Sequence, residues 1–229
     1  MFIDKYYILL VMPAILLALF AQARVQSAFG KYSRIQSMRG LTGREAAQRI
    51  LFDNGITDVR FEHIKGNLTD HYDPRENVIR LSDAVDSSTS VAAIGVAAHE
   101  AGHAVQYATG YAPIKLRAAI IPVTQIGSQL SIPLILLGVF MSSQSLINYG
   151  IILFALVALF QLVTLPVEFN ASARALRAID ASGLLTGEEL SGTRTVLSAA
   201  AMTYVAALIT SLAQLLRLVL IFGGGRNRD

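Results

Sequence analysis

The chain of 229 residues contains no cysteine, which excludes disulfide bonds, a cysteine nucleophile and a thiolate metal site. Charged residues make up only 15% of it, whereas soluble domains carry about a quarter. Glycine and proline occur in ordinary numbers, so a disordered or fibrous chain is excluded. The nineteen Lys and Arg residues are offset by sixteen Asp and Glu, so the chain has no basic stripe for nucleic-acid binding. With 53% hydrophobic residues, the composition is that of a membrane protein.

Three long segments carry no charged side chain, and their lengths predict membrane spans. The segments are residues 6–23, 118–167 and 195–216. Because a spanning helix needs about 20 apolar residues, the middle segment fits two spans joined by a short turn near residues 142–148. We therefore predict about four transmembrane helices. They cover roughly residues 6–24, 119–140, 148–167 and 198–222.

Two features of these spans leave alternatives open. Ala21-Gln22-Ala23 resembles a small-residue cleavage site, so the first span could be a signal peptide. The residues before it carry no net positive charge and its apolar run is long, which favours an uncleaved span. The second span contains several polar side chains, and we expect them to face other helices or a water-filled cavity rather than lipid. They are Gln125, Ser128, Gln129 and Ser131.

Basic residues near the spans indicate which side of the membrane each segment faces. Several follow the first span, whereas Lys5 alone precedes it, and others lie beyond the third span. Since short cytoplasmic flanks are enriched in lysine and arginine, we expect the N-terminus outside and both charged segments in the cytoplasm. The flanking residues are Arg24, Lys31, Arg34, Arg39, Arg174, Arg177 and Arg194.

Residues 26–117 have the pattern of a small α+β segment with helical and alternating stretches. Thr42 and Glu45 have the spacing of a capping box at the start of a helix. The other expected elements are strands at 59–64 and 77–82 around a turn-rich stretch at 66–75, and a helix from about Ser90 to Tyr107.

The fold is therefore expected to be mainly α-helical, with a multi-pass membrane part and a small α+β catalytic insertion. The expected parts are a first transmembrane helix (1–25), a cytoplasmic α+β segment (26–117), a transmembrane hairpin (118–167), a helix and loop with a third ligand (168–194), and a fourth transmembrane segment with a tail (195–229).

The second helix of the α+β segment carries His99-Glu-Ala-Gly-His103. Residues four apart lie one above the other on a helix, so both imidazoles can bind one ion. Glu100 lies one step round the helix, where it can reach a water on that ion. Zinc lowers the pKa of such a water to about 7, so Glu100 can remove its proton and later pass it to a leaving amine. The motif therefore predicts a catalytic zinc with Glu100 as general base.

The alternative is a hydrogen-bonded histidine pair in the core, without a metal. Residues 91–98 are entirely apolar or glycine, so the motif lies at the end of a buried helix. Two histidines and a glutamate there would each cost several kcal/mol without a partner, and a metal ion supplies that partner. The context therefore favours the metal site.

A catalytic zinc has three protein ligands and one open position, so a third ligand is required. His63 and His71 are possible ligands upstream of the motif. Glu168 is favoured because it directly follows the third span in a segment of helical character. The hairpin of spans between His103 and Glu168 returns the chain to the same side of the membrane. The alternative is that Glu168 only marks the membrane boundary.

These motifs resemble those of membrane metallopeptidases. The motif with the later Glu168-Phe-x-Ala-Ser172 is similar to the gluzincin pattern of the CAAX-prenyl proteases and of HtpX. Longer stretches are similar to the YugP-like neutral zinc metallopeptidases of bacteria, over about residues 32–216. The stretches are Asp70-His-Tyr-Asp-Pro, Val96-Ala-Ala-His-Glu-Ala-Gly-His-Ala-Val-Gln106 and Pro166-Val-Glu-Phe.

The resemblance implies a gluzincin-type site with one Zn²⁺ per chain, held by His99, His103 and Glu168, and with Glu100 as base. The CAAX-prenyl protease motif has an aspartate where this chain has Ser172, so a supporting carboxylate is not expected from this position. In gluzincins an edge strand beside the motif helix binds the peptide substrate, and residues 77–82 are the expected strand.

A tetrahedral intermediate needs a hydrogen-bond donor besides the metal. The possible donors are His71, Tyr72, Tyr111 and Arg174. His71 is favoured because it lies just before the expected edge strand, and we predict a catalytic role for it. The ordinary alternatives are that the tyrosines are interfacial aromatics and that His71 shapes a loop.

The sequence thus predicts an integral-membrane zinc metalloendopeptidase at the cytoplasmic face of a bacterial cell membrane. Its expected substrates are peptides or membrane-associated proteins, and no nucleic-acid partner is expected. The alternative is a catalytically inactive, zinc-stabilised scaffold or adaptor, although a purely structural site has no need of Glu100. A channel or transporter is disfavoured, since the spans contain no ionisable residue except Arg217.

Overall fold

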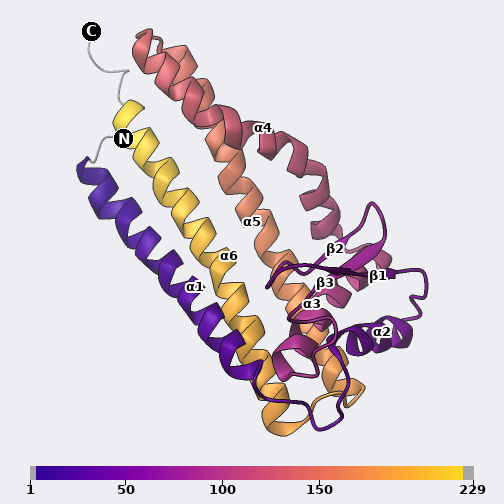
Figure 1. The fold of residues 1–229 in the computed structure, drawn as a ribbon. Coiled ribbons are helices and arrows are strands. Elements are labelled where there is room, and N and C mark those ends of the chain that lie inside the picture. Colours follow the sequence, from indigo (N-terminus) through magenta and orange to yellow (C-terminus); the bar gives the residue numbers. More distant parts are fainter. Residues whose placement is uncertain (1–3, 224–229) are drawn as a thin grey trace. The chain divides into compact units, whose positions relative to one another are not determined.

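The computed structural model describes residues 4–223 of the chain (Figure 1). Its four long helices confirm the prediction of a mainly helical, multi-pass membrane protein, since each is long and apolar enough to cross a membrane. The predicted tail at residues 224–229 lies outside the described residues. The long helices are α1 (Met12–Tyr32), which continues the short π-helix η1 (Tyr7–Val11), α4 (Ala112–Phe140), α5 (Gln144–Ala181) and α6 (Gly187–Phe222).

The long helices extend well beyond the apolar runs that predicted them. Helix α5 continues through Pro166 to Ala181, so Glu168 lies on the same helix as the third apolar run. The turn between α4 and α5 is short, at residues 141–143. The chain divides into two compact units, one made of residues 1–21, 115–166 and 203–229 and the other of residues 22–114 and 167–202.

In the first unit the long helices lie side by side in the order α4, α5, α6, α1 (Figure 1). Small residues bring α4 and α5 close together, since a Cβ on Gly127 would lie 3.0 Å from the backbone oxygen of Leu153. Helix α6 contacts α1 through the hydroxyl of Thr210, which donates to the backbone oxygen of Ala14 at 3.4 Å.

Arg217, the ionisable residue expected inside the last span, has an acidic partner. Its Nε lies 2.9 Å from Oδ2 of Asp4, and its guanidinium lies 5.3 Å from the centre of the Tyr7 ring. The hydrogen bond from Arg217 lowers the pKa of Asp4 from its ordinary value. The pair therefore joins the start of the chain to α6 with a neutralised charge.

The second unit contains two further helices and a three-stranded sheet. The capping box of Thr42 and Glu45 is confirmed at the start of one helix, and Ser90 caps the other through the backbone N–H of Ala93. These elements are α2 (Gly43–Asp53), β1 (Arg60–Ile64), β2 (His71–Asp73), β3 (Val78–Ser82) and α3 (Val91–Ala108).

The strand order is β1-β3-β2, with β1 parallel and β2 antiparallel to β3. The expectation that residues 77–82 form the edge strand beside the motif helix is therefore wrong. Strand β3 is central, and the edge strand beside α3 is β2, which lies in the stretch expected to be turn-rich. The reason is that β2 is three residues long and flanked by turn-forming residues, so its alternation is too short to recognise.

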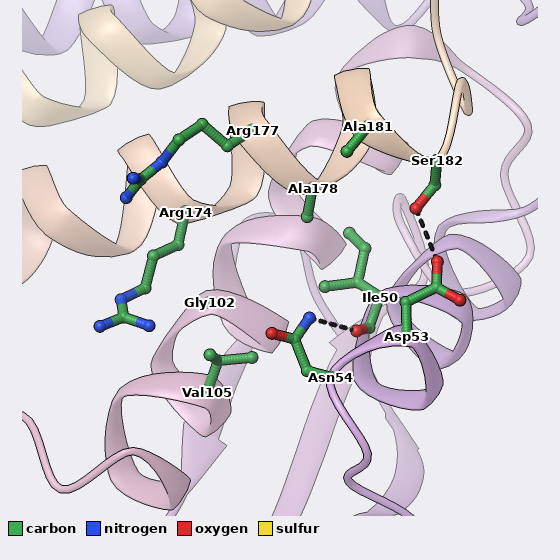
Figure 2. Close-up of a pocket in the computed structure, with 10 residues that line it drawn as sticks. All are labelled: Ile50, Asp53, Asn54, Gly102, Val105, Arg174, Arg177, Ala178, Ala181 and Ser182. Carbon is green, nitrogen blue, oxygen red and sulfur yellow. Dashed lines mark hydrogen bonds between the residues drawn. The ribbon is translucent and has the colours of Figure 1, made fainter.

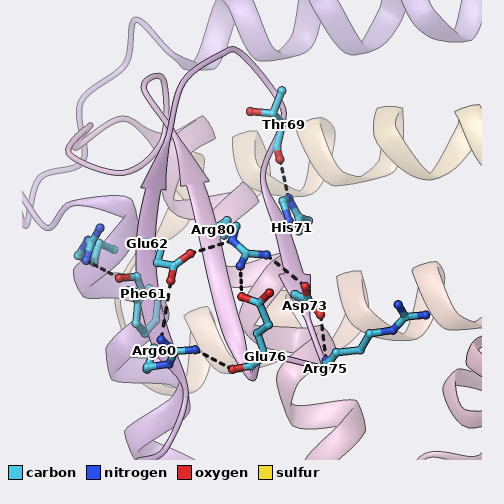
Figure 3. A network of polar contacts seen from close by, with 10 residues as sticks. Arg60, Phe61, Glu62, Thr69, His71, Asp73, Arg75, Glu76 and Arg80 are labelled. Carbon is cyan, nitrogen blue, oxygen red and sulfur yellow. Dashed lines mark hydrogen bonds and ion pairs between the residues drawn. The ribbon is translucent and has the colours of Figure 1, made fainter.

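Arg80 in β3 ties the three strands together on one face of the sheet (Figure 3). Its Nε lies 2.8 Å from Oε2 of Glu62 in β1, and its Nη1 lies 3.1 Å from Oδ2 of Asp73 in β2. Glu76, in the turn before β3, also pairs with it. The short edge strand is thus held by side chains as well as by the sheet hydrogen bonds.

Helix α3 lies in the core of this unit, very close to α5 and α6. A Cβ on Gly102 would lie 2.7 Å from the backbone oxygen of Ala171 in α5. A Cβ on Gly95 would lie 2.8 Å from the side chain of Thr193 in α6. Glycine at these two positions therefore lets α3 pack closely on both helices. Gly102 sets the distance between α3 and α5, the two helices that carry the site described next.

Candidate metal centre

Three side chains with metal-binding groups converge in the second unit. His99 and His103 come from α3, and Glu168 comes from α5. Oε2 of Glu168 lies 3.2 Å from Nε2 of His99 and 3.5 Å from Nε2 of His103, and the ligand atoms all lie within 4.8 Å of one another. Glu168 is only 2% exposed, so water does not compete for its carboxylate.

The spacing of these atoms fits a tetrahedral metal ion. Nitrogen and oxygen ligands about 2.1 Å from zinc in a tetrahedron lie about 3.4 Å from each other. The two distances from Glu168 to the histidine nitrogens are close to this edge length. Two imidazoles and one carboxylate are also the donor set of a catalytic zinc site with one open position.

Buried Gln106 fixes the ring of His103. Nδ1 of His103 donates to Oε1 of Gln106 at 3.0 Å, because an amide oxygen can only accept. The amide nitrogen of Gln106 donates to the backbone oxygen of Val167 at 2.8 Å and to Oδ1 of Asn170 at 3.0 Å. These two acceptors on α5 determine which way the amide points. Nδ1 of His103 therefore carries a hydrogen, and Nε2, which lies on the side of Glu168, is the nitrogen available to a metal.

Ser172 supports the other histidine. Its hydroxyl lies 3.1 Å from Nδ1 of His99, one turn along α5 from Glu168. When Nδ1 of His99 donates to this hydroxyl, Nε2 is free to bind a metal. A serine thus contacts the histidine from the position where the CAAX-prenyl protease motif has an aspartate.

Glu100 lies next to the cluster and is held by the edge strand. It is 8% exposed, and its Oε2 accepts a hydrogen bond of 3.0 Å from the backbone N–H of Tyr72 in β2. Asp70, just before β2, accepts from the backbone N–H of Ser82 at 2.7 Å and from the Ser82 hydroxyl at 3.0 Å. Asp70 therefore anchors the beginning of the strand that orients Glu100.

The electrostatic setting favours a bound cation. Burial acts to lower the pKa of His103, but the hydrogen bond to Glu168 and the carboxylates of Glu100 and Glu168 outweigh it and raise that pKa. Burial also raises the pKa of Asp70, against the hydrogen bonds from Ser82. The carboxylates of Glu100 and Glu168 therefore favour a positive charge beside His103, which a bound metal ion can supply.

The other two histidines lie outside the cluster. Nε2 of His63 lies 2.8 Å from Oδ1 of Asp83, and Nδ1 of His71 donates to the backbone oxygen of Thr69 at 2.9 Å. Both are exposed. His71 pairs with Arg80 across the strands and shares its face of the sheet (Figure 3), so its ring is directed away from α3. The catalytic role expected of His71 stays a prediction.

Tyr72 and Tyr107 face each other between β2 and α3, with ring centres 5.6 Å apart. The hydroxyl of Tyr72 donates to Oδ1 of Asn77 at 2.8 Å, and burial raises the pKa of Tyr72 to about 12. Tyr72 therefore stays protonated at neutral pH, and it contributes its backbone N–H to the site.

The other possible donors, Tyr111 and Arg174, contact each other. The guanidinium of Arg174 lies 5.8 Å from the centre of the Tyr111 ring, and its Nε donates to Oδ1 of Asn170 at 2.8 Å. Asn170 also accepts from Gln106, so Arg174 is connected to His103 through two side chains. Arg174 therefore supports the side chains that orient His103 and does not itself contact the ligand atoms.

A cavity of about 460 Å³ lies on a neighbouring side of α3 (Figure 2). Arg174 and Arg177 of α5 lie at one side of it, and Asp53 and Asn54 lie at the other. None of the three ligand-type residues lines this cavity. It is therefore separate from the metal centre.

The comparisons with known proteins agree with this geometry. Residues 7–223 match the family described as "Putative neutral zinc metallopeptidase". The chain belongs to this family. It is also 48% identical over 223 residues to "Putative membrane protease YugP" of Bacillus subtilis (strain 168), with 97% of this chain and 99% of that protein covered. No solved structure is significantly similar to the chain. The resemblance stated from the motifs is confirmed.

Sequence reasoning missed Gln106 and Asn170 as supports of the site. A signal for Gln106 was present, because it lies three residues after His103 and hence on the same side of the helix. Asn170 has no such signal, since its role depends on the approach of α5 to α3.

Proposed function

We propose that this protein is an integral-membrane zinc metalloendopeptidase of the gluzincin type. The observation that supports the proposal best is the triangle of His99, His103 and Glu168 next to the buried carboxylate of Glu100. Membership of a zinc metallopeptidase family names the metal that fits this donor set. One Zn²⁺ per chain is proposed, held by the three residues.

The bound zinc would act as a Lewis acid toward a water molecule and the scissile carbonyl. Gln106 and Ser172 orient the two imidazoles so that both Nε2 atoms face the same point as Glu168. The close contact of α3 and α5 at Gly102 holds the two imidazoles and the carboxylate in this arrangement.

Glu100 is the proposed general base. The N–H of Tyr72 binds one of its carboxylate oxygens, which leaves the other oxygen to remove a proton from the attacking water. The same carboxylate then passes that proton to the amine of the departing peptide. Its place beside His99 on α3 puts it one residue from a ligand, as the mechanism requires.

The proposed substrate strand is β2 rather than β3. It is the edge strand next to α3, so an extended peptide can add to it. Since Tyr72 in this strand also holds Glu100, the element that would bind the peptide is the element that orients the base. This connection would place a bound peptide beside the catalytic carboxylate.

We further propose that the site faces the cytoplasm, at the surface of the bacterial cell membrane. The proposal rests on the basic residues that follow α1's apolar run and on the four apolar helices. The substrates would be peptides or membrane-associated proteins. YugP of Bacillus subtilis, the relative described above, is itself named as a membrane protease.

The alternative, an inactive zinc-stabilised scaffold, predicts a different response to one substitution. Glu100→Gln should abolish peptidase activity on casein-derived peptides and leave the zinc content unchanged. The matched control is Glu188→Gln, an exposed glutamate at the start of α6, which should change neither quantity. Zinc without peptidase activity in the unaltered protein would favour the scaffold, and a protein without zinc would contradict both.

A further inference from the structure

Helix α4 in the first unit has one buried side and two exposed sides of different chemistry. Its buried side packs on α5 through small residues, and a Cβ on Gly150 of α5 would lie 2.7 Å from the backbone oxygen of Ser131. Ser131 is 1% exposed, as expected for a polar residue of this span. The residues of this buried side are Thr124, Gly127, Ser131, Ile135 and Gly138.

The three other polar residues of the span are exposed, so no helix within residues 4–223 covers them. Gln125, Ser128 and Gln129 are spaced three and four apart, so they share one side of the helix. We name these three residues the polar face of α4. The hydroxyl of Ser128 donates to the backbone oxygen of Gln125 at 2.9 Å and is thereby satisfied.

The remaining exposed surface of α4 is apolar and suits lipid. Val123 is 52% exposed, Ile126 57% and Leu130 47%. These residues lie about 100° or more round the helix from the centre of the polar face. The contrast between the two exposed sides shows that only one of them is suited to contact hydrocarbon.

The polar face also lies deep in the apolar run. Gln125 and Gln129 are about 12 and 18 Å along the helix from Arg117, the last charged residue before the run. The hydrocarbon core of a bilayer is about 30 Å thick, so the two amides lie near its middle. Within residues 4–223 neither glutamine side chain forms a hydrogen bond to another residue of the chain. An amide in hydrocarbon is expensive to leave without a partner.

We propose that the polar face of α4 binds the same face of a second copy of this chain. A glutamine amide carries both donors and an acceptor, so two identical faces are complementary to each other. A two-fold axis along the membrane normal places Gln125 and Gln129 of both copies at the same depth. Helix α4 is the end helix of the row in the first unit, with α5 on one side, so no further helix of that unit lies beyond it (Figure 1). Polar side chains hold transmembrane helices together in this way.

Cysteine cross-linking tests the pairing directly because the chain has no cysteine of its own. Ser128→Cys on the polar face should form a disulfide-linked dimer when native membranes are treated with a membrane-permeant oxidant. Leu130→Cys, two residues away on the apolar side, is the matched control and should stay monomeric. Adding Gln125→Leu and Gln129→Leu to Ser128→Cys should reduce the cross-linked fraction about tenfold, since interhelical hydrogen bonds are removed.

Separate outcomes would overturn the proposal. Equal cross-linking of Ser128→Cys and Leu130→Cys would indicate random collision, and cross-links of Ser128→Cys to other proteins alone would identify a foreign transmembrane segment as the occupant. An absence of dimer with both Ser128→Cys and Ile132→Cys, the adjoining position on the same side, would also contradict it. The folding control is the thermal unfolding of the Gln125→Leu/Gln129→Leu protein. An unchanged unfolding temperature would show that the loss of cross-linking does not come from an unfolded chain.

Discussion

Nδ1 of His103 donates to the side-chain oxygen of Gln106, 3.0 Å away, on the side of the ring opposite Glu168. Gln106 is completely buried and its amide nitrogen is held by two acceptors of α5. The orientation of one amide therefore determines which nitrogen of His103 is available to a metal. This contact joins the motif helix to the helix that carries the third ligand.

Gln106→Met should weaken zinc binding about 10- to 100-fold, because the substitution keeps the volume but removes the acceptor that orients His103. Competition with a fluorescent zinc chelator measures the change. The control is Thr109→Val, at the residue that caps the C-terminal end of α3, where the hydroxyl donates only to backbone oxygens of that helix. Equal zinc affinities of the Gln106→Met and control proteins would show that the amide does not determine the orientation of the His103 ring.

Ser172→Ala should also weaken zinc binding, by removing the hydroxyl next to Nδ1 of His99. Ser172→Asp should restore or strengthen binding, since a carboxylate is a stronger acceptor for the same N–H. Zinc affinity of the three proteins, in the order Ala, Ser, Asp, is the measurement. A weaker Asp variant would mean that the site lacks space or already has enough negative charge.

Glu168→Ala should abolish peptidase activity and strongly reduce zinc content, and Glu168→Asp should retain only traces because its carboxylate is one methylene too short. His63→Ala should change neither quantity, since His63 pairs with Asp83 at the surface. His71→Ala should keep its zinc, and a fall in kcat would support its predicted role as an oxyanion donor. Zinc lost from either histidine variant but kept in Glu168→Ala would replace the proposed site by a three-histidine one.

Asp70 should make the folding stability depend on acid pH. Because burial raises its pKa, the folded protein holds this proton more tightly than the unfolded chain does. The contribution of Asp70 to the free energy of unfolding should therefore be greatest below the ordinary aspartate pKa of 3.8 and be lost as the pH rises through the raised value. The Tm of the wild type minus that of Asp70→Asn, recorded between about pH 3 and 7, should decrease with pH. A constant difference would contradict this.

The predicted orientation can be tested by labelling single cysteines in intact cells. Ser145→Cys, exposed in the first turn of α5, should react with a membrane-impermeant maleimide. Ser87→Cys, exposed in the loop before α3, should react only after the cells are opened. The reverse pattern would place the metal centre outside the cytoplasm and leave its chemistry unchanged.

The features that the sequence determined are those written in local spacing. Apolar runs without charge specify the four long helices, because a bilayer requires about 20 such residues in succession. His99 and His103 share one side of a helix at four residues' spacing whatever surrounds that helix. Capping of α2 by Thr42 and of α3 by Ser90 likewise depends only on neighbouring residues.

The tertiary structure decided the remaining features of the fold and the site, because these depend on residues far apart in the chain. The edge position of β2 follows from its pairing with β3 and from the cross-strand contacts of Arg80, which three residues of sequence do not encode alone. The contact of Gln106 with Asn170 and that of His99 with Ser172 exist because Gly102 lets α3 and α5 approach. The tertiary structure also decided that Gln125 and Gln129 are exposed, since α4 packs on α5 through its small residues.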